Sequence, residues 1–165
     1  MAVHFEALQE GHAREVMGIF NYYVAHGFAA YPETALPESF FGKFLEMTAG
    51  YPAFAMKDAE GGGIVGFCFL RPYNPFATFK KTAEITYFIK PAFTGRGLGA
   101  LALARLEHEA KGKGIRFLLA SISSKNEMSL AFHKKNGFWQ CGYFRDIGEK
   151  RGEPFAVVWM QKELA

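Results

Sequence analysis

The feature that most constrains the fold is a glycine-rich loop directly before an amphipathic stretch, "FTGRGLGALALARLEHEA", at residues 93–110. Apolar side chains in that stretch recur at the spacing of one helix face, at Leu98, Ala102, Leu106 and Ala110. Glycines let a backbone approach a ligand closely, and the first turn of a helix offers unpaired N–H groups. The stretch therefore predicts either an ordinary tight turn or a phosphate-binding loop at the start of a helix.

The segments around this loop predict both strands and helices. Apolar spacing predicts a helix over residues 12–25 and a second one beginning near Pro37, and Asn126 is a good N-cap for a short helix ending at Gly137. Extended, β-branched and aromatic stretches predict strands at 53–58, 64–71, 82–90, 115–123, 138–148 and 155–163. With no repeat or linker, residues 1–165 are expected to form one α+β (mixed α/β) domain.

Composition excludes several classes of protein. The net charge is only +3 and no long run of like charges occurs, so we do not expect a nucleic-acid partner. The longest apolar stretch, "GIVGFCFL", is far shorter than the roughly 20 residues of a membrane span, so we expect no membrane partner. Cys68 and Cys141 lie far apart and in no metal-ligand spacing. We expect both thiols in the core, no metal, and a reduced, cytoplasmic location without a secretory leader.

Three phosphate-loop patterns compete for the glycines. The P-loop pattern fails, because no Lys-Ser or Lys-Thr follows them. The dinucleotide pattern fits Gly95, Gly97 and Ala100, but the next strand ends in "ASIS" without the carboxylate that would hold a ribose. The third pattern, [QR]-x-x-G-x-[GA], is the pyrophosphate loop of acyl-CoA-dependent acetyltransferases. It fits residues 94–99 except that Thr94 replaces Arg or Gln.

The order of motifs around the loop closely resembles the GNAT acetyltransferase superfamily, and within it the phosphinothricin/methionine-sulfoximine N-acetyltransferase-like group. The resemblance rests on the strand "TAEITYFIK", the glycine loop, the Asn-initiated helix ending "FHKKNGF" and the tail "GYFRDIGEKRG". The segment "IFNYYVAHGFAAYPETALP" near the N-terminus also resembles the group. The resemblance implies a GNAT fold, a central twisted, mostly antiparallel sheet with flanking helices. It further implies an N-acetyltransferase that uses acetyl-CoA and forms a homodimer.

The resemblance also implies residues for the chemistry. Glu84 would be the base that takes a proton from the acceptor amine, and alternation places it on one strand face with Thr86 and Phe88. His133 would protonate or hydrogen-bond the leaving thiolate, unless it is an ordinary helix-surface histidine. The expected acetyl-CoA contacts are Tyr87, Phe88, Ile89, Thr94, Gly95, Arg96, Gly97, Leu98, Gly99 and Asn126.

On the acceptor side, Arg71-Pro72 resembles the group's "W-R-P" loop, and an arginine fork suits an amino-acid carboxylate. The expected substrate contacts are Arg71, Pro72, Tyr73, Glu84 and Thr86. Phe28, Tyr31, Tyr73 and Phe79 are expected to enclose an aromatic pocket for a small-molecule amine, an amino acid or analogue.

Two departures from the group leave the acceptor open. The loop after Arg71 is about two residues longer than usual, and Pro154 and Ala156 stand where relatives often carry Trp and Asp. Phosphinothricin itself is therefore not assured as the substrate. The competing functions are a protein or peptide N-terminal acetyltransferase, a non-catalytic CoA-binding module and a dinucleotide-binding module. For the homodimer, we expect the aromatic loop at 28–32 at or near the contact.

Overall fold

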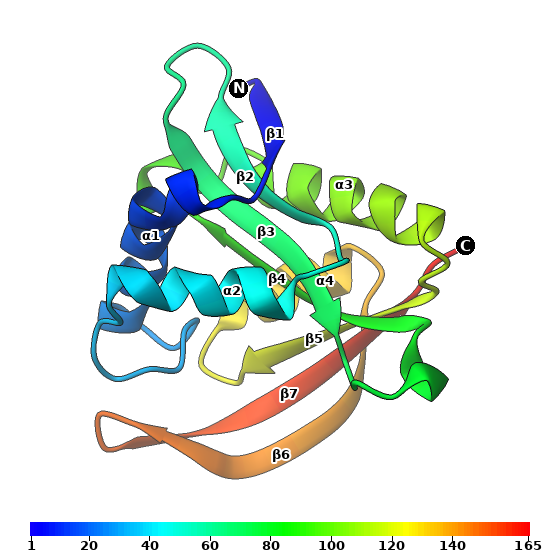
Figure 1. The fold of residues 1–165 in the computed structure, drawn as a ribbon. Helices are drawn as coiled ribbons and strands as arrows, with labels where there is room; N and C mark the ends of the chain where they lie inside the picture. The colour runs from blue at the N-terminus through cyan, green and yellow to red at the C-terminus, as the bar shows by residue number, and fades with distance from the viewer.

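The computed structural model describes residues 1–165 and contains one seven-stranded sheet in the order β1-β2-β3-β4-β5-β7-β6 (Figure 1). The strands are β1 (Val3–Ala7), β2 (Ala53–Asp58), β3 (Ile64–Pro72), β4 (Thr82–Ile89), β5 (Phe117–Ser123), β6 (Trp139–Lys150) and β7 (Glu153–Glu163). The α-helices are α1 (Ala13–Ala25), α2 (Phe41–Met47), α3 (Leu98–Gly112) and α4 (Glu127–Lys135). No helix has the length and apolar composition needed to cross a membrane.

Neighbouring strands run antiparallel except β4 and β5, which pair in parallel. This arrangement confirms the expected mostly antiparallel sheet with flanking helices. The sequence prediction missed β1, whose five residues "VHFEA" carry a His and a Glu and pair only with β2 at the sheet edge. It also began the second helix too early, because Pro37 has an extended backbone and α2 starts at Phe41.

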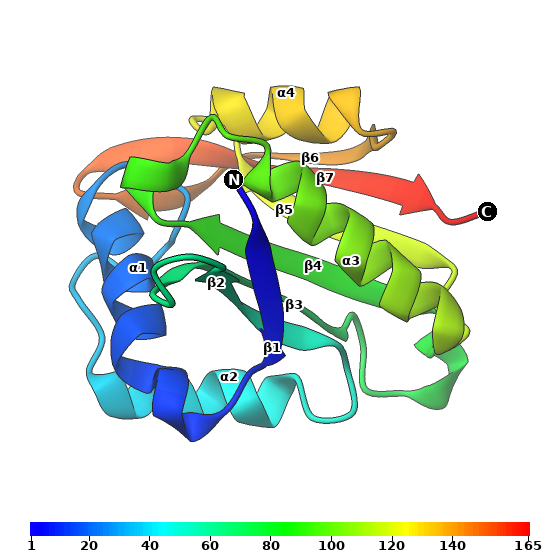
Figure 2. The same ribbon diagram turned by 90° about the horizontal axis from the view of Figure 1, so that it is seen from above.

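Helices cover the two faces of the sheet differently, as the view from above shows (Figure 2). On one face α3 packs its predicted stripe, Leu98, Ala102, Leu106 and Ala110, into a core of 19 buried residues. That core reaches across the sheet from β2 to β7, through Met56 and Met160. On the other face α1 and α2 form a core of 12 buried residues with Ala30 and side chains of β2 and β3, and Phe88 of β4 packs against it. The α1/α2 face of β5, β7 and β6 therefore has no helix in its core.

The parallel pair β4–β5 opens partway along its length. Register pairs join the two strands at Thr82, Ala83 and Glu84, whose partner is Leu119. Beyond Glu84, β4 continues to Ile89 without pairing with β5, while β5 remains paired with β7 as far as Ser123. The gap leaves backbone groups along one edge of β4 without a strand neighbour, and Glu84 stands at its start.

Candidate active site

Glu84 and Arg71, both predicted as site residues, are brought together by the sheet. They are register partners on β4 and β3, and Arg71 Nη2 donates to Glu84 Oε1 across 2.9 Å. The side chain of Glu84 is 14% exposed, and that of Arg71 is 38% exposed. Arg71 Nη1 lies 3.8 Å from Met47 Sδ, and its Nε is buried without a hydrogen-bond partner. The pair therefore presents one carboxylate and one guanidinium side by side on the α1/α2 face.

Alternation along β4 places the predicted residues as expected. Ala83 and Ile85 are buried in the α3 core, whereas Phe88 packs against the core of α1 and α2. Thr86, two residues after Glu84, shares its face. Glu84 therefore faces the space beside α1 and α2, and not the side on which α3 and the glycine loop lie.

Tyr31 also lies near Glu84, although the sequence argument gave it only a general place in an aromatic pocket. Burial raises the pKa of Tyr31, the Ser121 hydroxyl lowers it, and the negative charge of Glu84 raises it further. Tyr31 stacks on Phe155 of β7 at 5.5 Å, and Phe28 packs edge-on against the same ring. The phenol group is thus an uncharged hydroxyl close to the carboxylate.

A buried lysine fixes the segment that carries Tyr31. Lys150 is 1% exposed, and its Nζ donates to the carbonyls of Gly27 and Ala30 at 2.8 and 2.7 Å. Burial lowers the pKa of Lys150. Arg151 adds a bond from Nη2 to Val24 O at 2.7 Å. These contacts join the turn between β6 and β7 to the segment after α1, so the 28–32 loop packs within its own chain.

The glycine loop before α3 has the geometry of an anion cradle. Gly95 and Gly97 adopt positive φ angles of 75° and 80°, and Gly97 is the residue before the first turn of α3. The first intrahelical bond begins at Leu101, which donates to the Gly97 carbonyl. The backbone N–H groups of residues 95–100 donate to no other backbone carbonyl, and a Cβ built on Gly95 or Gly97 meets nothing within 4 Å. These free donors at a helix start, with open space before them, fit a pyrophosphate.

Two further expected cofactor contacts are Arg96, within this loop, and Asn126, at the start of α4. The Arg96 guanidinium lies 5.2 Å from the centre of the Phe93 ring, so its position is partly set by a cation–π contact. Asn126 caps α4, because its Oδ1 accepts from Ser129 N at 3.2 Å. Its side-chain amide N–H groups remain available to a ligand. Tyr87, Phe88 and Ile89 lie on the part of β4 that does not pair with β5.

His133 is not the exposed helix residue that its position in the sequence allows. It is 3% exposed and hydrogen-bonded through both ring nitrogens. Nδ1 lies 2.7 Å from the Ser129 carbonyl, so Nδ1 carries the proton and Nε2 accepts from the Tyr87 hydroxyl. Burial lowers the pKa of His133 and raises that of Tyr87. Both side chains are thus neutral near pH 7, and any contact between His133 and a leaving sulfur would run through Tyr87.

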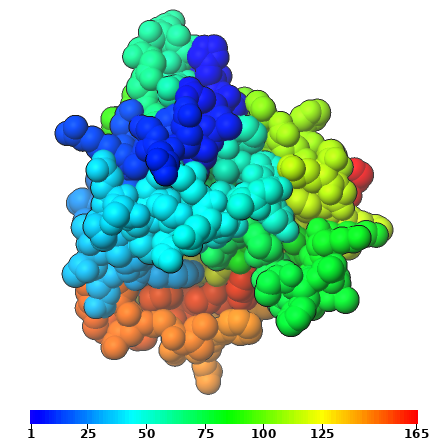
Figure 3. All heavy atoms as spheres, viewed as in Figure 1, coloured from blue at the N-terminus to red at the C-terminus, as the bar shows by residue number.

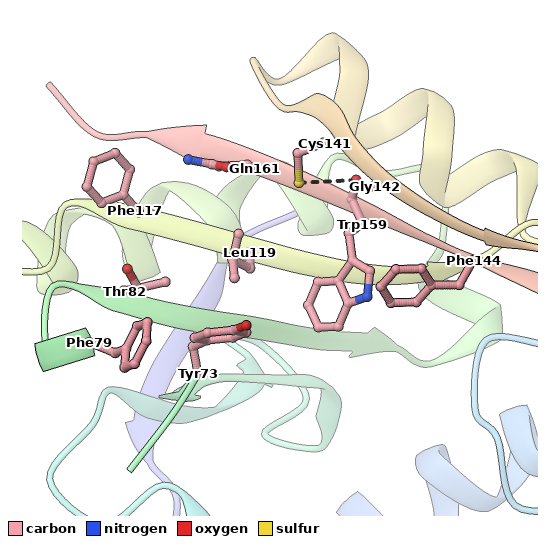
Figure 4. Close-up of a pocket in the computed structure, with 10 residues that line it drawn as sticks. All are labelled: Tyr73, Phe79, Thr82, Phe117, Leu119, Cys141, Gly142, Phe144, Trp159 and Gln161. Atoms are coloured by element: carbon pink, nitrogen blue, oxygen red, sulfur yellow. Dashed lines mark hydrogen bonds between the residues drawn. The ribbon is translucent and has the colours of Figure 1, made fainter. Parts of the chain in front are cut away.

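An aromatic hollow lies on the uncovered half of the α1/α2 face, with a volume of about 570 Å³ (Figure 4). Tyr73 and Phe79 line it from the β3–β4 loop, Leu119 from β5, and Trp159 and Gln161 from β7. Figure 3 shows the surface between the green β3–β4 loop and the orange β6 hollowed in this region, with red β7 visible inside. We call this hollow the aromatic pocket.

The aromatic pocket corrects one expectation from the sequence. Tyr73 and Phe79 line it and lie 5.7 Å apart, but Phe28 and Tyr31 belong to a separate group around Phe155. Trp159 was not singled out, because the run "FAVVWM" is apolar at every position and so has no polar–apolar alternation that would show which face Trp159 lines. Cys141 was expected in the core, but it is exposed on β6 and lines the pocket, whereas Cys68 is buried.

Comparisons of the sequence and of the structure with known proteins both find acetyltransferases. Residues 14–138 match the model of the acetyltransferase (GNAT) family. The L-methionine sulfoximine/L-methionine sulfone acetyltransferase of Pseudomonas aeruginosa is 28% identical over 151 residues, 90% of this chain and 87% of that protein. A phosphinothricin acetyltransferase from Sinorhizobium meliloti, solved with acetyl-CoA, superposes with a TM-score of 0.92 at 25% identity, covering 100% of this chain and 90% of that one. The structure of a ribosomal-protein-alanine N-acetyltransferase from Brucella melitensis gives 0.88 at 27% identity, covering 99% and 100%.

Proposed function

This chain belongs to the GNAT family and is an acetyl-CoA-dependent N-acetyltransferase, and we propose that its acceptor is the primary amine of an amino acid or a close analogue. The observation that carries the proposal is the Arg71–Glu84 pair at the start of the gap between β4 and β5. An α-amino acid carries an ammonium and a carboxylate on one carbon. A guanidinium and a carboxylate held side by side are complementary to both groups.

On the donor side, acetyl-CoA supplies a thioester whose acyl carbon an amine can attack. The free N–H groups of residues 95–100 would hold its pyrophosphate, assisted by the dipole of α3 and the charge of Arg96. Thr94 and the backbone of residues 87–89 would contact the rest of the cofactor, with Asn126 opposite them on α4. These residues fix the acetyl group near Glu84 without providing a charged side chain at the reacting carbon.

On the acceptor side, the amine arrives mostly as ammonium, because the pKa of an α-amino group is roughly 8. Glu84 would take its proton, directly or through a water, with the oxygen that Arg71 does not hold. Arg71 would bind the acceptor carboxylate, Tyr73 continues the same wall, and Thr86 lies on the other side of Glu84. Pro72 pairs with Ala83 and faces the α3 side of the sheet, so it would shape the loop and not contact the acceptor. The amine nitrogen then attacks the acyl carbon and the C–S bond breaks. The thiolate that leaves takes up, through water, the second proton that the nitrogen loses as the amide forms.

We propose that His133 contributes to this release through Tyr87 and not by touching the sulfur. Burial keeps the Tyr87 hydroxyl protonated, and His133 fixes its direction from α4. The Tyr87 hydroxyl has one proton, which it donates to His133 Nε2 in the free enzyme, so this proton would turn from His133 to the thiolate as the thiolate forms. A neutral phenol then stabilises the thiolate by a hydrogen bond without full proton transfer, since a thiol is the stronger acid. Tyr87→Phe would remove this bond and keep the ring contact with His133.

The experiment that tests the function measures CoA release with a panel of amines. Free amino acids, their analogues phosphinothricin and methionine sulfoximine, and short peptides with free N-termini are compared at equal concentration. Acetylation of free amino acids supports the proposal. Acetylation of peptides alone would favour the protein N-terminal alternative, which the likeness to the Brucella melitensis enzyme keeps under test. CoA binding without any turnover would favour a non-catalytic module.

We also propose that the enzyme is a cytoplasmic homodimer. Both cysteines are unpaired, which suits a reducing compartment. Exposed apolar side chains gather on the edge strand β6, at Trp139, Tyr143, Phe144 and Ile147, and offer more apolar surface than the 28–32 loop. A monomer in light scattering at tens of micromolar would contradict the homodimer.

A further inference from the structure

We infer that the aromatic pocket receives the side chain of the acceptor and selects amino acids with large, uncharged apolar or aromatic side chains. This inference rests on the proposed function and names the substrate class for the same site. The pocket has one occupant, the side chain of the amino acid whose α-carboxylate binds Arg71 and whose α-amino group lies at Glu84.

The aromatic pocket lies within reach of Glu84. Leu119, which lies in the pocket, is the register partner of Glu84. Thr82 precedes Glu84 by two residues in β4, so it lies one step further along the same face. Tyr73 follows Arg71 by two residues, just past the end of β3, and both Thr82 and Tyr73 line the pocket. Two residues of a strand span about 7 Å, which is comparable to the reach of an aromatic side chain from its α-carbon. An acceptor with its amine at Glu84 can therefore place its side chain in the pocket.

The aromatic pocket and the expected donor site extend from Glu84 in opposite directions. The gap between β4 and β5 opens after Glu84, toward Ile89, and that is where the acetyl donor is expected. The pocket lies on the opposite side of Glu84, toward Thr82 and Phe117, where the two strands are paired. Donor and acceptor side chain would therefore extend in opposite directions from the carboxylate and would not compete for space.

The lining of the aromatic pocket is mostly apolar and uncharged. Seven of the ten lining residues are hydrophobic, and none is charged. Tyr73 packs edge-on against both Phe79 and Trp159, at 5.7 and 6.5 Å, so a ring would meet edges and faces of further rings. In Figure 4 the rings of Tyr73 and Phe79, from the β3–β4 loop, lie on one side and those of Trp159 and Phe144, from β7 and β6, on the other, with Leu119 of β5 between the two pairs. A carboxylate or ammonium would be desolvated here without an ionic partner, which disfavours acidic and basic side chains.

The volume suits the same class. About 570 Å³ lies within the usual range for small-molecule sites. Glycine or alanine would leave most of this space unfilled. An amino acid with a large apolar side chain in the pocket is expected to have a kcat/KM about 10- to 100-fold higher than alanine. This ratio is the equivalent of burying one large hydrophobic group.

The test compares kcat/KM for alanine, leucine, phenylalanine, tryptophan, aspartate and lysine in the wild type and two alanine variants. Phe79 lines the pocket, whereas Phe76, in the same loop, is 71% exposed and does not line it. We expect phenylalanine and tryptophan to be the best acceptors and aspartate and lysine the worst. Phe79→Ala should lower kcat/KM for phenylalanine about tenfold and for alanine much less, whereas Phe76→Ala should match the wild type.

A third variant should improve the acetylation of lysine, which is expected to be among the worst acceptors of the wild type. Gln161→Glu places a carboxylate in the pocket from β7, so lysine should improve relative to phenylalanine by at least about tenfold. This change in preference cannot arise from a folding defect, because it is a ratio measured on one preparation.

The outcomes separate this inference from the proposed function. Failure to acetylate any of the amino acids would remove the proposed function. Acetylation without preference among the side chains, or equal effects of Phe79→Ala and Phe76→Ala, would overturn the pocket assignment alone. The same holds if Phe79→Ala changes the association state in light scattering and leaves acceptor preference intact, because the pocket would then be a contact between copies of this chain.

Discussion

The two sides of Glu84 offer a ligand different kinds of contact. Toward Ile89 and the start of α3, the available groups belong to the backbone: an unpaired strand edge, free N–H groups and positive φ angles at Gly95 and Gly97. Toward Arg71 and the aromatic pocket, they are side chains from five strands and one loop. A backbone site suits a cofactor that does not vary, whereas a side-chain site can be changed residue by residue. The donor site is therefore expected to tolerate many side-chain changes, and the acceptor site to change specificity with single ones.

The largest effect is expected from Glu84→Gln, which keeps the bond from Arg71 to a side-chain oxygen but removes the proposed base. We expect kcat to fall about 10²- to 10⁴-fold while acetyl-CoA affinity, measured by calorimetry, stays near the wild-type value. The loss should shrink as the pH rises past roughly 8, because more of the amine is then free. Full activity at pH 7 would place the base elsewhere.

Arg71→Ala comes next and separates two roles of one guanidinium. Removing a charge-assisted contact to the acceptor carboxylate should lower kcat/KM for an amino acid about 10- to 150-fold. The decarboxylated analogue lacks that contact, so its smaller loss reports only the broken pair with Glu84. Equal losses on both substrates would show that Arg71 only positions Glu84.

Gly97→Ala tests the backbone side, with Gly50→Ala as its matched control. Both glycines have positive φ, 80° and 82°, and a Cβ on either meets nothing within 4 Å. Each substitution should lower the free energy of unfolding by roughly 1–2 kcal/mol through backbone strain. Gly97→Ala alone should also weaken acetyl-CoA binding, by about tenfold, because its Cβ enters the space in front of the free N–H groups. Similar acetyl-CoA affinities in both variants would remove this assignment.

The smallest effect concerns His133 and pH. Burial lowers its pKa in the folded chain, so below about 6.5 the unfolded chain binds more protons. The stability from neutral His133 is complete above pH 6.5 and is lost as the pH falls from there through the folded pKa. Urea unfolding at pH 7.5 and 5.5 should show a shallower pH dependence for His133→Gln, by at most about 1.4 kcal/mol per pH unit. Parallel pH profiles would show that His133 is not the group responsible.

Much of the fold was readable from local pattern. The stripe on α3 and the alternation on β4 are periodic signals that follow from helix and strand geometry, and both are confirmed. The N-cap at Asn126 and the helix end at Gly137, which has a positive φ, follow from local chemistry, and both predictions are confirmed. Strand β1 was missed because a short edge strand has little pattern of its own, and Cys141 was misplaced because a thiol carries no sign of burial.

The sequence by itself determined the glycine loop, the family resemblance and the types of residue available for proton transfer, because each is carried by neighbours along the chain. Only the tertiary structure decided which of them meet. The register of β3 with β4 pairs Arg71 with Glu84, and the packing of α4 buries His133 against Tyr87. The absence of a helix over β5 and β7 gathers Tyr73, Phe79 and Trp159 around one hollow. These contacts join residues 13, 46 and 80 or more positions apart, and such distances are closed by sheet register and packing, which no local pattern encodes.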